Sequence, residues 1–132
     1  MMLDIQNLDY EGLTIQVDQT AGGRLTFIWK GRSTSREPGK VLTPYFERAL
    51  VEASDLRYAI EMHFEDLEHF NSSTIAAVIQ FINSAHSRNV DLVMHYDQTQ
   101  KWQQLSFDAL RRALKPFESV AGSSVKFVSV QR

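Results

Sequence analysis

Cysteine is absent from this chain of 132 residues. Its absence excludes disulfide bonds, a zinc site built from thiolates and a cysteine nucleophile. Long apolar runs are absent too, because no stretch reaches the roughly 18 to 20 residues of a membrane-spanning helix. The 6 glycines are scattered, and they do not form the glycine-rich loop that holds a phosphate group. We therefore expect neither a cofactor nor a membrane span.

The charge balance and the first residues limit the function and the cellular location. Lysine and arginine together number 14, and aspartate and glutamate 16, which gives a formal net charge of −2 at pH 7. A general nucleic-acid binder would be basic, so we exclude that class. Residues 1–6 contain an early acid and no basic segment, unlike a signal peptide. The composition is typical of a cytoplasmic globular protein, and we expect one domain over residues 1–132.

Apolar residues alternate in some segments and follow helical spacing in others. Alternation predicts strands in five segments: 13–17, 25–29, 58–64, 90–96 and 125–130. Spacings of three and four predict helices in three segments: 42–53, 75–85 and 102–117. Gly22 and Gly23 favour a hairpin between the first two strands. Pro44 is expected in the first turn of the first helix, and residues 31–40 in a polar loop.

The helical spacing also predicts which residues face the core. For the first helix these are Leu42, Phe46, Ala49, Leu50 and Ala53. For the second they are Ile75, Val78, Ile79, Ile82 and Ala85. For the third they are Trp102, Leu105, Ala109, Ala113 and Phe117. Pro116 and a loop at Gly122 are expected to end the third helix.

The element order β-β-α-β-α-β-α-β indicates an α/β fold. Successive β-α-β units favour right-handed crossovers and parallel pairing of the later strands. The strands alternate in polarity, whereas strands covered on both faces are continuously apolar. We therefore predict a mixed β-sheet with helices packed mainly on one face and a more polar, partly open opposite face.

Residues 64–75 carry the most informative motif. A strand runs into a turn that we expect to be acidic and solvated, containing Glu65, Asp66 and Glu68. Two serines then stand at the start of an apolar helix, within the run Asn71-Ser72-Ser73-Thr74. Such residues are common helix N-caps. A phosphate would also be accepted there, because a helix N-terminus offers free N–H groups and a positive dipole end. Capping and a phosphorylation switch are compatible.

In this context the motif resembles the STAS domain of bacterial anti-sigma-factor antagonists, whose motif is roughly Asp-Ser-Ser-Gly-Leu. The run Asn71-Ser72-Ser73-Thr74-Ile75 stands in the same place, and the resemblance covers about residues 11–130. The chain is most similar to SiaC-type regulatory phosphoproteins, whose motif is nearer Asn-Thr-Ser-Ser-Ile. That group also has a Trp/Met-His-Tyr-Asp sequence after the next strand, matched by residues 94–97. Asn71 in place of the acid and Thr74 in place of glycine favour the SiaC-type branch.

The resemblance implies a partner-switching cycle in bacterial signalling, such as biofilm or stress regulation, and no enzymatic activity. A serine kinase of the GHKL type would phosphorylate the helix start, and a PP2C-type phosphatase would reverse this. The unmodified form would bind an anti-sigma factor or a diguanylate cyclase. The antagonist alignment places the phosphate on Ser73 and the SiaC alignment on Ser72; both stay open, with Ser73 ranked first. The residues expected to shape the partner-binding surface are Glu65, Asp66, Glu68, Asn71 and Thr74.

Two other functions remain open from the sequence. One is a constitutive STAS-like subunit of an ABC lipid-transport system, and the other is a small enzyme, which a fold alone does not exclude. The four histidines are His63, His69, His86 and His95. Their spacing is not that of metal ligands, so we expect no metal site. His63 and His95 are expected on the open face of the sheet, near each other.

Overall fold

The fold is seen in a computed structural model that describes residues 5–20, 22–114 and 125–130. Its elements are β1 Leu8–Tyr10, β2 Leu13–Thr20, β3 Arg24–Ser33, α1 Gly39–Leu56, β4 Ala59–His63, β5 Leu67–Phe70, α2 Ser72–Ser87, β6 Leu92–Asp97, α3 Lys101–Leu114 and β7 Val125–Val130. Pro116, Phe117 and Gly122, which the sequence analysis placed at or after the end of the third helix, lie outside the described residues. Within the described ranges, no helix is both long and apolar enough to cross a membrane.

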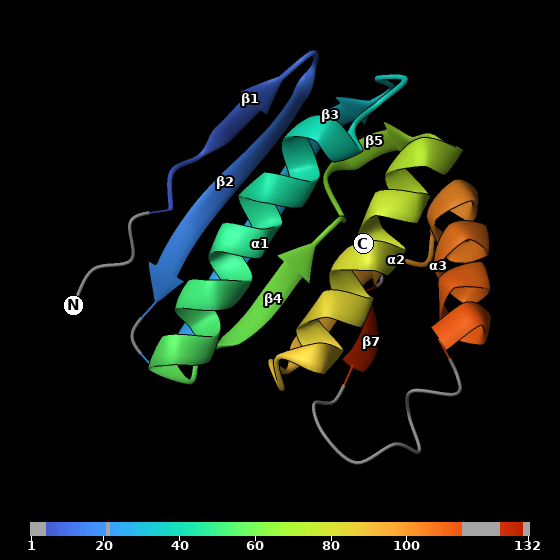
Figure 1. The fold of residues 1–132 in the computed structure, drawn as a ribbon. Coiled ribbons are helices and arrows are strands. Elements are labelled where there is room, and N and C mark those ends of the chain that lie inside the picture. The colour runs from blue at the N-terminus through green and yellow to red at the C-terminus, as the bar shows by residue number, and fades with distance from the viewer. Residues whose placement is uncertain (1–4, 21, 115–124, 131–132) are drawn as a thin grey trace.

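The strands of the described ranges form one mixed sheet. The strand order is β1-β2-β3-β4-β6-β7. β5 pairs with the last residues of β3, beyond the part of β3 that pairs with β4. β1, β2 and β3 are antiparallel, whereas β4, β5, β6 and β7 pair in parallel. Figure 1 shows α1, α2 and α3 together over one face of the sheet. The predicted α/β fold, with a mixed sheet and helices on one face, is therefore confirmed.

The hairpin predicted at Gly22 and Gly23 is also confirmed. These residues join β2 to β3, which pair in antiparallel register from Leu13↔Gly31 to Thr20↔Arg24. Their φ angles of 110° and 77° lie in the region that favours glycine. The hairpin brings the alternating apolar residues of both strands to the face that the helices cover.

The predicted core face of α1 is confirmed, because all five residues are buried: Leu42, Phe46, Ala49, Leu50 and Ala53. Phe46 stacks on Trp29 of β3, with ring centroids 5.7 Å apart. Trp29 also lies 4.9 Å from the ring of Phe64, the residue after β4. Each such buried side chain contributes about 1.5–3 kcal/mol through apolar burial. This aromatic cluster joins the first helix to the centre of the sheet.

The position predicted for Pro44 is wrong. α1 begins at Gly39, so Pro44 is its sixth residue and lies in the second turn. The apolar pattern starts only at Leu42, because the first three helical residues are half-buried or exposed. A proline there removes the N–H that would bond to the carbonyl of Lys40.

The sequence analysis does not predict β1 or β5. The second half of β3 pairs with β5, from Gly31↔Leu67 to Ser33↔Phe70. Residues 31–33 are therefore strand, not loop, and residues 67–70 are strand, not an acidic turn. The buried residues of β5, Leu67 and Phe70, are three positions apart. The register shifts between Gly31 and Arg32, so β5 lacks the period-two pattern that predicts a strand.

The predicted core face of α3 is wrong except at Trp102, which is partly buried against the core. Leu105 is 58% exposed, and Ala109 and Ala113 are exposed as well. The buried residues are instead Gln103, Phe107, Leu110 and Leu114. The first residue of the buried face, Gln103, is polar. A pattern based on apolar residues alone therefore assigns the wrong residues of this helix to the core.

Candidate functional site

The N-terminus of α2 is held by a side-chain cap. Asn71 is the N-cap, with extended backbone angles. Its Oδ1 accepts hydrogen bonds from the Thr74 N–H, at 2.9 Å, and from the Thr74 hydroxyl, at 2.8 Å. Its Nδ2 donates to the carbonyl of Ser35, at 2.8 Å. The amide of Asn71 thus satisfies one free helix N–H and joins the helix start to the segment after β3.

Thr74 anchors the same turn from inside the protein. Its side chain is fully buried, with 0% exposure, and its Oγ1 lies 2.7 Å from the Oγ of Ser33, the last residue of β3. The Asn71 N–H also donates to the Ser33 carbonyl, at 3.1 Å. Burial leaves the Thr74 side chain no direct access to a partner. Thr74 instead fixes the loop that presents the serines.

Ser72 and Ser73 are the first two residues of α2, and both are exposed. The first N–H groups of an α-helix have no acceptor within the helix. A negative group on either side chain would therefore lie beside unpaired N–H groups and the positive end of the helix dipole. Exposure does not distinguish the two serines, so both remain candidates.

The predicted acidic residues differ in how exposed they are. Asp66 and Glu68 are exposed on the turn before β5 and on β5 itself. The side chain of Glu65 is only 13% exposed, and both of its carboxylate oxygens lie 3.2 Å from Nδ1 of His63. Glu65 therefore belongs to a histidine-containing group on the open sheet face, and the structure of the described residues shows no contact between it and the serines.

The contact between Glu65 and His63 shifts the pKa of both side chains. Burial acts to raise the pKa of Glu65, but the hydrogen bond from His63 and the nearby histidine charges hold it below its ordinary value. The same hydrogen bond raises the pKa of His63, while burial opposes the rise. The pairing leaves Glu65 less exposed than Asp66 and Glu68.

A buried glutamine that sequence reasoning missed supports the turn before β5. Nε2 of Gln103 donates to the carbonyls of Phe64, at 2.7 Å, and Leu67, at 3.1 Å. Its Oε1 accepts from the Asp97 N–H, at 2.7 Å. The side chain thus joins α3 to the β4–β5 turn and the end of β6. The pattern of buried residues at 103, 107, 110 and 114 is the signal that could have found it.

Most of the Met94–Asp97 segment is structural. Met94, Tyr96 and Asp97 are buried, at 0%, 4% and 3% exposure. The ring of Tyr96 stacks on Phe107, with centroids 4.9 Å apart. Asp97 accepts hydrogen bonds from the N–H and the hydroxyl of Thr99, just before α3. Only His95 of this segment is directed to the open face of the sheet.

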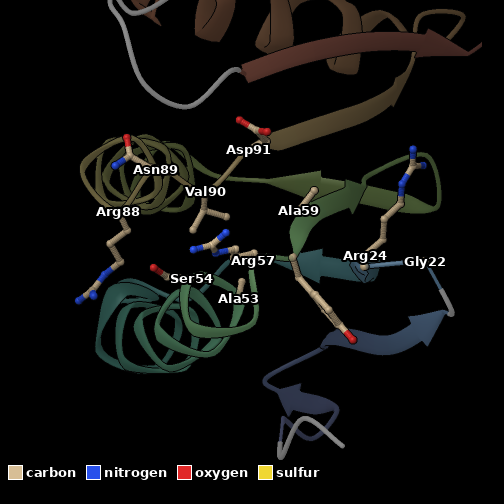
Figure 2. Close-up of a pocket in the computed structure, with 12 residues that line it drawn as sticks. Gly22, Arg24, Ala53, Ser54, Arg57, Ala59, Arg88, Asn89, Val90 and Asp91 are labelled. Carbon is tan, nitrogen blue, oxygen red and sulfur yellow. The ribbon is translucent and has the colours of Figure 1, made fainter. Parts of the chain in front are cut away.

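A hollow of about 600 Å³ lies at the other end of the molecule, beside the C-terminal ends of α1 and α2. Arg24, Arg57 and Arg88 contribute to its lining, with no histidine, lysine or cysteine. Figure 2 shows Arg24 and Arg88 at opposite sides of the hollow, extending away from each other. Arg24 contacts Glu61 at 3.4 Å and Arg88 contacts Glu47 at 3.2 Å. Arginines at helix C-termini are explained by the helix dipole, and this hollow does not offer convergent catalytic groups.

Comparison of the sequence with protein-family models and with curated proteins gave no match. The fold is similar to a solved structure of the diguanylate cyclase SiaD in complex with its activator SiaC from Pseudomonas aeruginosa. The match to SiaC has a TM-score of 0.58 at 16% sequence identity, and it covers 94% of this chain and 98% of the other. At this identity the similarity shows a shared fold.

Proposed function

We propose that this chain is a SiaC-type regulator whose binding to a partner protein is switched by phosphorylation at the start of α2. The unmodified form binds a diguanylate cyclase, a GHKL-type serine kinase modifies Ser73 or Ser72, and a PP2C-type phosphatase reverses the change. The protein acts in the bacterial cytoplasm as a binding module, not an enzyme. The observation that carries the proposal is the exposed pair Ser72–Ser73 on a rigidly held helix start, in a fold shared with SiaC.

Rigid support and exposure together suit a switch. Asn71 and Thr74 fix the backbone through hydrogen bonds to the Ser33–Ser35 segment, whereas the two serines are exposed. A kinase can therefore reach a hydroxyl without opening the core. A phosphate adds about −1.5 to −2 charges at pH 7, and the helix N-terminus stabilises it. The modification changes the surface but leaves the fold in place.

The acidic residues near the helix start give the phosphate its effect on a partner. Glu68 is exposed on β5, four residues before Ser72, and Asp66 is exposed two residues earlier. A partner that fits the unmodified surface, comprising the 66–73 segment and the exposed side of α2, then meets a larger negative charge. Like-charge repulsion and loss of fit both weaken binding.

The test combines phosphorylation mapping with binding. The full chain is incubated with ATP and a GHKL-type serine kinase, and the modified residue is mapped by tandem mass spectrometry. Binding to a candidate diguanylate cyclase, and the rate of cyclic di-GMP formation, are then measured for Ser72→Asp, Ser73→Asp and the two alanine variants. We expect the aspartate at the modified position to weaken binding and activation, and the alanine to preserve both.

Gln104→Glu is the matched control, because it adds one negative charge at an exposed position of α3, outside the proposed partner-binding surface. Equal binding by the wild type and by both aspartate variants would refute the switch. Loss of binding in Gln104→Glu as well would show a general charge effect. Constitutive binding to a transporter ATPase with no phosphorylation would instead favour the lipid-transport subunit, and binding to an anti-sigma factor alone would replace the cyclase as target.

A further inference from the structure

The open face of the sheet brings together three side chains that are separated in the sequence. β4 and β6 are parallel neighbours, and His63 lies directly opposite His95. Glu61 precedes His63 by two residues, so its side chain emerges on the same face of the sheet. The two imidazole rings are stacked, with centroids 4.1 Å apart and planes 3° from parallel. Nε2 of His95 lies 3.0 Å from Oε1 of Glu61.

We propose that Glu61, His63 and His95 form a binding site for a divalent transition-metal ion of the Zn²⁺ class. Each of the three residues offers one ligand atom, and these atoms lie within 4.8 Å of one another. Two imidazoles and one carboxylate form a ligand set that suits Zn²⁺, Cu²⁺ or Ni²⁺. Mg²⁺ and Ca²⁺ prefer oxygen ligands and are not expected to bind here.

The distance between His95 and Glu61 is close to the one that a tetrahedral ion requires. Zinc–nitrogen and zinc–oxygen bonds of about 2.0–2.2 Å place two ligand atoms roughly 3.3 Å apart. His95 and Glu61 already satisfy this spacing, so an ion would take the place of the proton that they share. His63 must turn about its side-chain bonds until its lone pair converges on the same point. Its side chain is 28% exposed and that of His95 17%, which leaves room for this rotation.

Glu65 prepares His63 as a ligand. Both carboxylate oxygens of Glu65 lie 3.2 Å from Nδ1 of His63, so the Nδ1–H group donates to Glu65 and Nε2 is left for the metal. Metal-binding histidines commonly donate their second N–H to a carboxylate in this way. A hollow of about 170 Å³, lined by Ile28, His63, Glu65 and Asp66, adjoins the group. It offers space for water in the remaining coordination positions.

Arg24 lies beside the proposed site but leaves its ligand atoms accessible. Nη1 of Arg24 lies 3.4 Å from Oε2 of Glu61, whereas Oε1 faces His95. The Arg24 side chain is 61% exposed and can move into solvent. A glutamate side chain is ionised at neutral pH, as a metal ligand must be.

Zinc binding to the full chain is measured by isothermal titration calorimetry, and Co²⁺ binding by visible absorption. We expect one ion per chain and a Co²⁺ spectrum of a nitrogen- and oxygen-ligated site, since the chain has no cysteine. His63→Ala, His95→Ala and Glu61→Gln should each weaken Zn²⁺ binding by roughly 100-fold, and Glu65→Gln by about 10-fold. His69→Ala and His86→Ala are the matched controls and should bind as the wild type does.

Histidine ring resonances in the wild type provide a readout that does not depend on the variants folding. Addition of Zn²⁺ should shift the NMR signals of His63 and His95 but not those of His69 or His86. Absence of Zn²⁺ binding, unchanged affinity in the His63→Ala/His95→Ala double variant, or shifts confined to His69 or His86 would each overturn the proposal. Circular dichroism of every variant confirms that lost binding is not lost folding.

Discussion

Replacement of Asn71 by alanine tests the account of the α2 N-terminus. The change removes the acceptor of the Thr74 N–H and hydroxyl and the donor to Ser35. Loss of an N-cap costs about 0.5–2 kcal/mol, and loss of a further hydrogen bond adds about 0.5–1.5 kcal/mol. We therefore expect Asn71→Ala to lower the free energy of unfolding by about 1–3.5 kcal/mol.

Asn71→Asp is the informative comparison, because aspartate keeps the cap acceptor and restores the acid of the antagonist motif. It loses only the donor to Ser35, so we expect a cost of about 1 kcal/mol or less. Both variants are measured by urea denaturation followed by circular dichroism, with equal m-values as the check on two-state behaviour. The reasoning is refuted if Asn71→Ala lies within about 0.5 kcal/mol of the wild type, or if Asn71→Asp is as unstable as Asn71→Ala.

Two further predictions concern the core face of α3 and the response to alkaline pH. Phe107→Ala should lower the free energy of unfolding by about 3–5 kcal/mol, because its ring is 1% exposed. Leu105→Ala should change it by less than about 0.5 kcal/mol, because its side chain is 58% exposed; thermal melts of the pair would contradict the assigned face if the two losses were similar. Burial raises the pKa of Tyr45 to about 12, and its hydroxyl donates to the Gln6 carbonyl at 2.6 Å. Below the unfolded-state pKa of about 10 this contribution to stability is complete, and it is lost as the pH rises from about 10 to about 12. Urea denaturation across this range should show a smaller loss in Tyr45→Phe than in the wild type, and identical profiles would exclude a role for Tyr45.

Local periodicity in the sequence was sufficient to predict most strands of the sheet and the helix α1. Alternating residues such as Ile60, Met62 and Phe64 are all buried in the structure, because successive side chains of a strand point to opposite faces whatever the partner strand is. The same holds for the i, i+3, i+4 series of α1. The serine pair also lies where the sequence placed it, since a capping residue and the apolar run after it define a helix start locally.

Other features depended on contacts between distant segments. Gln103 looks like a surface residue in the sequence, yet three backbone groups brought by other elements allow it to be buried. β5 exists because β3 is long enough to pair with a second strand after β4 ends.

The sequence by itself determined the order of the main strands and helices, the face of α1 and the exposed serines at a helix start, because each depends on neighbours along the chain. Only the tertiary structure decided that Thr74 is an anchor, that Glu65 turns toward His63, and that His95 meets Glu61. Each of these is a pairing across the sheet or between layers. The spacing of residues in the chain does not specify such pairings, because they depend on strand order and register.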